Sequence, residues 1–164
     1  LKTREMLEWE YLPHLGRTAA QAIGASQDRL DWIRASSSDY EIALPLHDLT
    51  NFAFGQGYYH GAPLDMRLRQ LAHFRDICHQ LYPRLRVYLF DARQLYSAPV
   101  TVFGPLLSVI YLGQKYIAFR DSERVQAFIS HFDHLVREAQ ITARTLPDHI
   151  STLCEAAAKS HRHF

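Results

Sequence analysis

Apolar residues recur along this chain at two spacings, one typical of helices and one typical of strands. Between residues 121 and 139 they return every three or four residues over four turns, which predicts a helix with one buried face. Asp121 precedes this stretch as the expected N-cap. Pro63 and Pro83 bound a second predicted helix, and Pro147 begins a third.

Shorter apolar runs predict strands. The sequence RVYLFD at 86–91 is almost continuously apolar, which is typical of a central strand covered on both faces. Further strands are predicted at 40–46, 100–103, 107–112 and 115–119, and Gly113 and Gln114 form a two-residue hairpin link between the last two. We therefore expect an α/β (α+β) fold with a mixed central sheet of about 4–5 strands, helices packed on it, and an N-terminal helix before it.

The first 38 residues carry a weaker helical pattern, with an apolar stripe from Leu12 to Ile33 that Gly24 interrupts. We assign residues 1–38 to N-terminal connector or dimerisation helices, and residues 39–164 to a single α/β sensor-like domain. The alternative is that the first helices pack on this domain. Because the chain opens at Leu1 on a charged helical pattern, we expect it to be a fragment of a longer protein.

The stretch 51–62 combines glycine with aromatic residues. Gly55, Gly57 and Gly61 predict a mobile loop, and their spacing does not match a phosphate-binding fingerprint. Two interpretations stay open: an ordinary surface loop, or a loop that lies over a ligand.

Composition narrows the class of protein. The chain has 164 residues, 48% of them apolar and 21% charged, which is typical of one soluble globular domain. The formal net charge of +1 provides no global field for nucleic acid or a membrane, and no apolar run approaches the roughly 20 residues of a membrane span. We expect a cytoplasmic protein without membrane contact, in which Cys78 and Cys154 are reduced core thiols.

Motifs of catalysis and metal binding are missing from the sequence. Ten histidines invite a metal site, but no HExxH or CxxC spacing occurs, and the helical pattern places His131 and His134 toward solvent. No GxSxG sequence is present either. We therefore assign no catalytic residue, no metal ligand and no cofactor.

A candidate ligand site follows the strand at 86–91. Asp91 ends this strand, and ligands of open α/β sheets usually bind at the carboxyl ends of strands. The predicted ligand-binding residues are Tyr88, Asp91, Arg93, Tyr96 and Tyr111. The alternative is a turn-forming aspartate beside a solvated arginine.

The stretch 86–139 resembles a known family. The strand RVYLFD, the hairpin LLSVIYLGQKYIAF and the helix with HFDHLVREA are similar to one half of a phospholipase-D-like fold. They resemble in particular the catalytically silent domains at the C-terminus of bacterial helix-turn-helix transcriptional regulators. Enzymes of that superfamily carry HxK followed by an aspartate, whereas His73 and His131 begin HFR and HFD here. The resemblance implies a sensing or dimerising module without phosphodiesterase activity.

Three functions remain open at this point. The first is the C-terminal effector-binding and dimerisation domain of a bacterial transcriptional regulator. It implies a homodimer, a small-molecule effector, and DNA contact only through a missing N-terminal domain. The second is a small cytosolic hydrolase of unfamiliar type that uses some of His47, Asp48, His73 and Asp91. The third is a protein-interaction scaffold with a large apolar patch.

Overall fold

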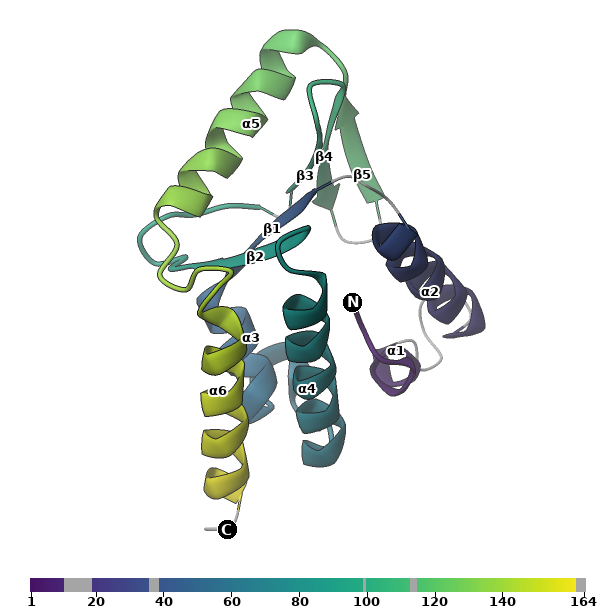
Figure 1. The fold of residues 1–164 in the computed structure, drawn as a ribbon, viewed down its shortest axis with the longest axis vertical. Coiled ribbons are helices and arrows are strands. Elements are labelled where there is room, and N and C mark those ends of the chain that lie inside the picture. Colours follow the sequence, from purple (N-terminus) through teal and green to yellow (C-terminus); the bar gives the residue numbers. More distant parts are fainter. Residues whose placement is uncertain (11–18, 36–38, 99, 113–114, 162–164) are drawn as a thin grey trace.

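The computed structural model describes residues 1–10, 19–35, 39–98, 100–112 and 115–161 (Figure 1). The elements in these residues are, in chain order, α1 (Arg4–Glu10), α2 (Ala19–Ala35), β1 (Tyr40–Pro45), α3 (Leu46–Phe54), the 3-10 turn η1 (Gly57–Tyr59), α4 (Leu64–Leu81), β2 (Leu85–Phe90), β3 (Val100–Phe103), β4 (Leu107–Leu112), β5 (Lys115–Phe119), α5 (Ser122–Arg137) and α6 (Leu146–His161). The chain is therefore a mixed α/β protein, and its five strands confirm the predicted strands.

These strands form two small sheets, so the prediction of one mixed central sheet was wrong. β1 and β2 pair in parallel, from Tyr40 opposite Leu85 to Pro45 opposite Phe90, while β3, β4 and β5 form a separate antiparallel sheet. The edge of β2 that does not face β1 pairs with the segment that follows α5. The Leu89 N–H donates to the Ile141 carbonyl at 2.9 Å, and the Ile141 N–H donates to the Leu89 carbonyl at 3.2 Å. Because this contact fills the position beside β2, β3 does not continue the parallel pair.

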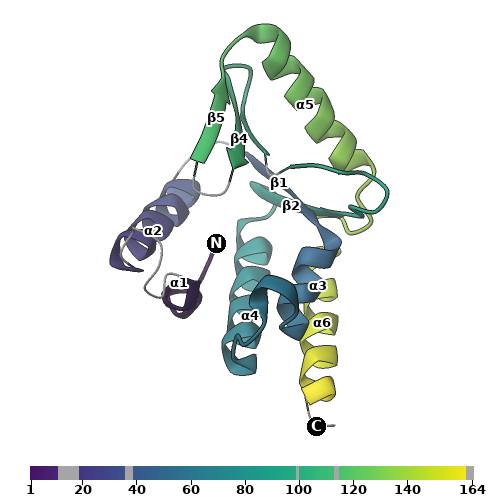
Figure 2. The same ribbon diagram turned by 180° about the vertical axis from the view of Figure 1, so that it is seen from behind.

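Helices cover both faces of the parallel pair (Figure 2). α3, α4 and α6 lie on one side of β1 and β2, and α5 lies on the other with the three-stranded sheet. The main hydrophobic core fills the first side, where residues of β2, α4 and α6 are almost fully buried: Leu71, Leu85, Leu89, Leu146 and Ile150. The covered sheet therefore agrees with the continuous apolar pattern of β2.

The prediction of a loop was wrong for residues 51–54, which complete α3. Gly55 follows with φ +64°, the Gly55 N–H donates to the Phe52 carbonyl, and the Gln56 N–H donates to the Asn51 carbonyl. This is the Schellman pattern that ends helices at glycine. The glycine that indicated a loop is thus a helix terminator.

Several local predictions are confirmed. α4 begins directly after Pro63, and the Asp121 carboxylate accepts a hydrogen bond from the Arg124 N–H at 3.0 Å as the N-cap of α5. Cys78 is buried, Cys154 is half-buried against the core, and burial raises the pKa of the Cys78 thiol to about 12; the reduced state of both thiols stays a prediction. No helix in the described part of the chain has the length and apolar character to cross a membrane.

The N-terminal helices share the core of the main domain. Met6, Leu30 and Ile33 are buried in the same cluster as the side chains of α4 and β2. The start of the predicted stripe at Leu12, like the hairpin residues Gly113 and Gln114, lies outside the described residues. The boundary at residue 38 stays a prediction.

Candidate functional site

The carboxyl ends of β1 and β2 lie side by side because the two strands are parallel and end in register at Pro45 and Phe90. His47 and Asp48 follow β1 in the first turn of α3, and Asp91 follows β2 directly. A pair of parallel strands is thus followed at one edge by three polar side chains, the arrangement in which open α/β sheets place their ligands.

Asp91 is held by the residue two positions further along the chain. Its carboxylate accepts from the Arg93 Nε at 3.0 Å, from the Arg93 Nη2 at 2.8 Å and from the Arg93 backbone N–H at 3.0 Å. The Asp91 side chain is 7% exposed, whereas that of Arg93 is 87% exposed. These hydrogen bonds, helped by the nearby charge of His47, lower the pKa of Asp91 to about 2. The carboxylate is therefore ionised and fixed in orientation at neutral pH.

The backbone after Asp91 turns sharply. The Asp91 carbonyl accepts from the N–H groups of Gln94 and Leu95, both at 3.0 Å. A hydrogen bond of 2.9 Å between the Ser97 Oγ and the His131 Nε2 then ties this turn to α5. The loop that leaves β2 is thus anchored at its start by Asp91 and near its end by α5.

A hollow of about 200 Å³ lies between this turn and the last turns of α5. Its wall is formed by two apolar and four polar side chains: Phe90, Asp91, Gln94, Leu95, His134 and Glu138. The volume is below the roughly 300–1,000 Å³ of sites for drug-sized ligands. An amide, an imidazole and a carboxylate together offer hydrogen-bond donors and acceptors to a small polar molecule.

The structure places the five predicted site residues in different surroundings. Asp91 lines the hollow, and Arg93 reaches into solvent from its ion pair with Asp91. Tyr96 is 83% exposed, and Tyr88 is half-buried in β2. The side chain of Tyr111 lies outside the described residues. Ligand binding by these five residues stays a prediction.

Other lining residues were absent from the predicted set, above all His134 and Glu138. The helical pattern of 121–139 placed His134 on the solvent side, and the side chain is indeed exposed. A pattern within one helix does not reveal which distant turn approaches its polar face. Only the fold brings the end of α5 to the end of β2.

Of the four residues named for a hydrolase, His47, Asp48 and Asp91 lie near one another, whereas His73 lies on α4. The His47 Nε2 and the Asp48 Oδ1 are 3.2 Å apart, and the charge of His47 acts on Asp91. His73 lies in the middle of α4, where burial and the positive charge of Arg34 lower its pKa. Among the described residues, no three His, Cys, Asp or Glu side chains are placed to hold one metal ion.

No protein-family model, curated protein sequence or solved structure matches this chain. The assignment of a site therefore depends on the geometry described above.

Proposed function

We propose that this chain is the effector-binding and dimerisation domain of a bacterial transcriptional regulator whose DNA-binding part lies outside these 164 residues. The observation that carries the proposal is the hollow between the turn after β2 and the end of α5. The lack of catalytic motifs and the resemblance of 86–139 to silent phospholipase-D-like domains support it as well.

The position of the hollow suits a regulatory ligand because its walls come from two different segments. Phe90, Asp91, Gln94 and Leu95 lie at the end of β2 and in the turn after it, whereas His134 and Glu138 lie at the end of α5. A ligand that contacts both walls stabilises one placement of α5 against the parallel pair. Such a ligand shifts the conformational equilibrium by its difference in affinity for the two placements.

The wall also limits the kind of effector. Asp91 is already bonded to Arg93, so Gln94, His134 and Glu138 are the polar groups left to contact a ligand. Phe90 and Leu95 provide apolar contact beside them. We propose a small polar molecule with hydrogen-bond donors and one short apolar part.

The test is a screen of small polar compounds by thermal shift and by NMR chemical-shift perturbation. A true effector raises the melting temperature of the parent chain and perturbs signals of Gln94 and His134. Gln94→Leu is expected to weaken binding by about tenfold, the loss of one or two hydrogen bonds.

Gln126→Leu is the matched control, because Gln126 is exposed on α5 and does not line the hollow. Binding that is equal in the Gln94→Leu and Gln126→Leu variants would contradict the proposed site. So would a screen in which every hit perturbs signals elsewhere in the chain.

A hydrolase is the second candidate, favoured by the His47–Asp48 pair beside Asp91 at the carboxyl ends of β1 and β2. Its weakness is that Asp91, held ionised by Arg93, is a poor proton acceptor at neutral pH. Turnover of an ester or phosphoester substrate that His47→Gln abolishes and His73→Gln preserves would favour this candidate over the regulator.

A further inference from the structure

The three-stranded sheet carries an exposed apolar surface on its last strand. Along β5, the side chain of Tyr116 is 67% exposed and that of Ile117 is 47% exposed. Ala118 is exposed as well, and Phe119 is half-buried. Successive side chains of a strand point to opposite faces, so β5 exposes apolar groups on both of its faces. A strand that is apolar on both faces is typical of a strand that is covered on both sides.

Among the described residues, β5 also has an edge without a paired strand. The strand order is β3-β4-β5, and in the described part of the chain β4 is the strand that pairs with β5. Because β4 is antiparallel to β5, alternate backbone N–H and C=O groups of β5 point away from β4. Sheets usually protect such an edge with proline, a bulge or charges; here Lys115 begins β5 and Arg120 and Asp121 follow it, while residues 116–119 contain no proline, bulge or charge.

We infer that a second copy of this chain pairs with β5 in the antiparallel direction, with a two-fold axis through Ala118. The two three-stranded sheets then become one sheet of six strands. This inference rests on the proposed function, which includes dimerisation, and it names the surface that forms the dimer.

The charges around β5 select this register. With the axis through Ala118, Lys115 lies opposite the partner's Asp121, and Tyr116 lies opposite the partner's Arg120. Opposite charges and a cation beside an aromatic ring both stabilise cross-strand pairs. Asp121 has extended backbone angles of φ −71° and ψ 140°, so the paired stretch can reach it.

The neighbouring registers lack this complementarity. An axis through Ile117 places Lys115 opposite Phe119 of the partner subunit and leaves the charge without an opposite charge. A shift by one residue is incompatible with two-fold symmetry, because it would set Ile117 opposite Ala118 of the partner subunit, and these side chains point to opposite faces of the strand. At the centre of the preferred register, Ala118 faces its own copy and is small enough for close approach.

Cross-linking at the axis tests the inference directly. In an antiparallel pair, opposite Cα atoms are about 4.5–5.5 Å apart, within the range that a disulfide spans. Oxidised Ala118→Cys is therefore expected to form a covalent dimer. Tyr96→Cys, on an exposed residue far from β5 in sequence, is the control and is expected to remain largely uncross-linked.

Sedimentation velocity of the whole chain across micromolar concentrations supplies the second measurement. Ile117→Lys places a charge on the edge and is expected to raise the dimer dissociation constant by about tenfold or more. Leu106→Lys is the control, since Leu106 is exposed in the turn before β4 and outside the proposed pairing. Circular dichroism checks that both variants fold.

The outcomes separate this inference from the function on which it rests. A dimer that Ala118→Cys cross-links and Ile117→Lys dissociates supports the β5 pairing. A dimer that neither change affects overturns the pairing and leaves dimerisation standing. A strict monomer overturns both the pairing and the dimerising half of the proposed function, while the Gln94→Leu binding test still decides the effector half.

Discussion

At the scale of single residues, Arg67 is a buried charged group held by two backbone carbonyls. Its guanidinium is buried in the first turn of α4, where Nε donates to the Ala62 carbonyl at 3.0 Å and Nη1 donates to the Ala53 carbonyl. Ala53 belongs to the last turn of α3, so the positive charge lies at the negative end of that helix. A Cβ at Gly55 would come within 3.0 Å of the Arg67 Cζ, which adds a steric reason for glycine there.

Removal of this guanidinium should be costly. Arg67→Met keeps the apolar stem but leaves two carbonyls without their donors, so we expect the free energy of unfolding to fall by about 2–3 kcal/mol. Arg69→Met is the control, because Arg69 forms an exposed ion pair with Glu5, and the loss of such a surface pair lowers the free energy of unfolding far less. Urea unfolding measures both, and equal losses would show that Arg67 contributes no more than a surface charge.

Asp91 predicts a dependence of stability on pH. Arg93 lowers the pKa of Asp91 from 3.8 to about 2 in the folded chain, so the ion pair stabilises the fold above the ordinary carboxyl pKa. That contribution is lost as the pH falls from about 4 toward 2. We expect the parent chain to melt at a higher temperature than Asp91→Asn at neutral pH, with a difference that shrinks across this acidic window.

Asp133→Asn is the control for this pH series, because Asp133 is an exposed residue on α5. It should melt like the parent chain at every pH. A melting difference for Asp91→Asn that persists unchanged at the acidic end would mean that the ion pair is not its source.

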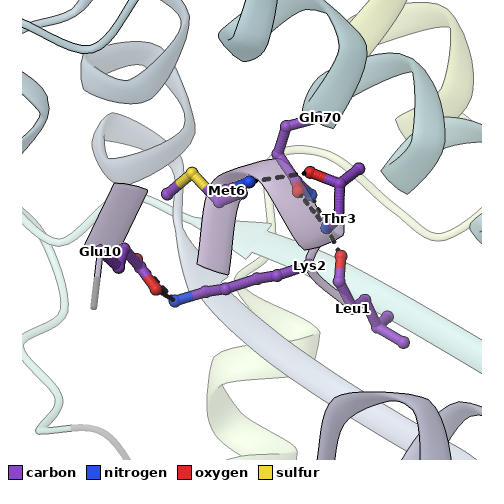
Figure 3. Close-up of polar contacts among 6 residues, drawn as sticks. All are labelled: Leu1, Lys2, Thr3, Met6, Glu10 and Gln70. Atoms are coloured by element: carbon purple, nitrogen blue, oxygen red, sulfur yellow. Dashed lines mark hydrogen bonds and ion pairs between the residues drawn. The ribbon is translucent and has the colours of Figure 1, made fainter. Parts of the chain in front are cut away.

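At the scale of elements, a buried amide of α4 binds the start of the α1 segment, beside the exposed ion pair of Arg69 with Glu5 and the packing of Met6. The Gln70 Oε1 accepts from the Thr3 N–H at 2.7 Å, and the Gln70 Nε2 donates to the Leu1 carbonyl at 3.1 Å (Figure 3). Thr3 in turn caps α1 by accepting from the Met6 N–H at 3.2 Å through its hydroxyl. The Lys2 Nζ donates to the Glu10 Oε1 at 2.7 Å and so connects the start of this segment to its end.

Gln70→Leu should loosen this segment without unfolding the rest. The change leaves two backbone groups without partners, which corresponds to about 1–3 kcal/mol for local opening of α1. Hydrogen exchange at Leu7, whose N–H donates to the Thr3 carbonyl, is expected to become at least about tenfold faster. Gln80→Leu, at an exposed position of the same helix, should leave that exchange rate unchanged.

The elements also show which sequence signals are reliable. The helices α4 and α5 are predicted because their apolar period continues over four or more turns and because Pro63 and Asp121 directly precede them. α3 was missed because it has nine residues and ends at a glycine that also suits a loop. The contact that holds the end of α3 in the helical conformation comes from Arg67, which belongs to another helix, α4.

At the scale of the whole molecule, the side chains pack in two unequal parts. The main core joins β1, β2, α4 and α6 with the N-terminal helices, and no described side chain between residues 91 and 140 belongs to it. The three-stranded sheet and α5 bury fewer large groups, among them Val109, Val125 and Leu135. Fewer buried apolar contacts mean a lower free energy of opening.

This difference predicts two classes of amide exchange. Amides of β4 and α5 should exchange through openings of lower free energy than amides of β2 and α6. Hydrogen exchange followed by NMR or mass spectrometry measures this, and it should be performed at low protein concentration to limit dimerisation. Uniform protection across all four elements would show that the molecule opens as one cooperative unit.

The sequence by itself determined the local structure of this protein. Apolar periods, proline positions and the Asp121 cap depend on contacts within a few residues, so they located five strands and the long helices. The tertiary structure alone decided which strands pair, because Ile141, some fifty residues further along, occupies the edge of β2. It also decided the walls of the hollow, because His134 and Asp91 meet only after α5 folds back on the parallel pair. Contacts between distant segments leave no periodic pattern in either segment, and this is the physical reason for the difference.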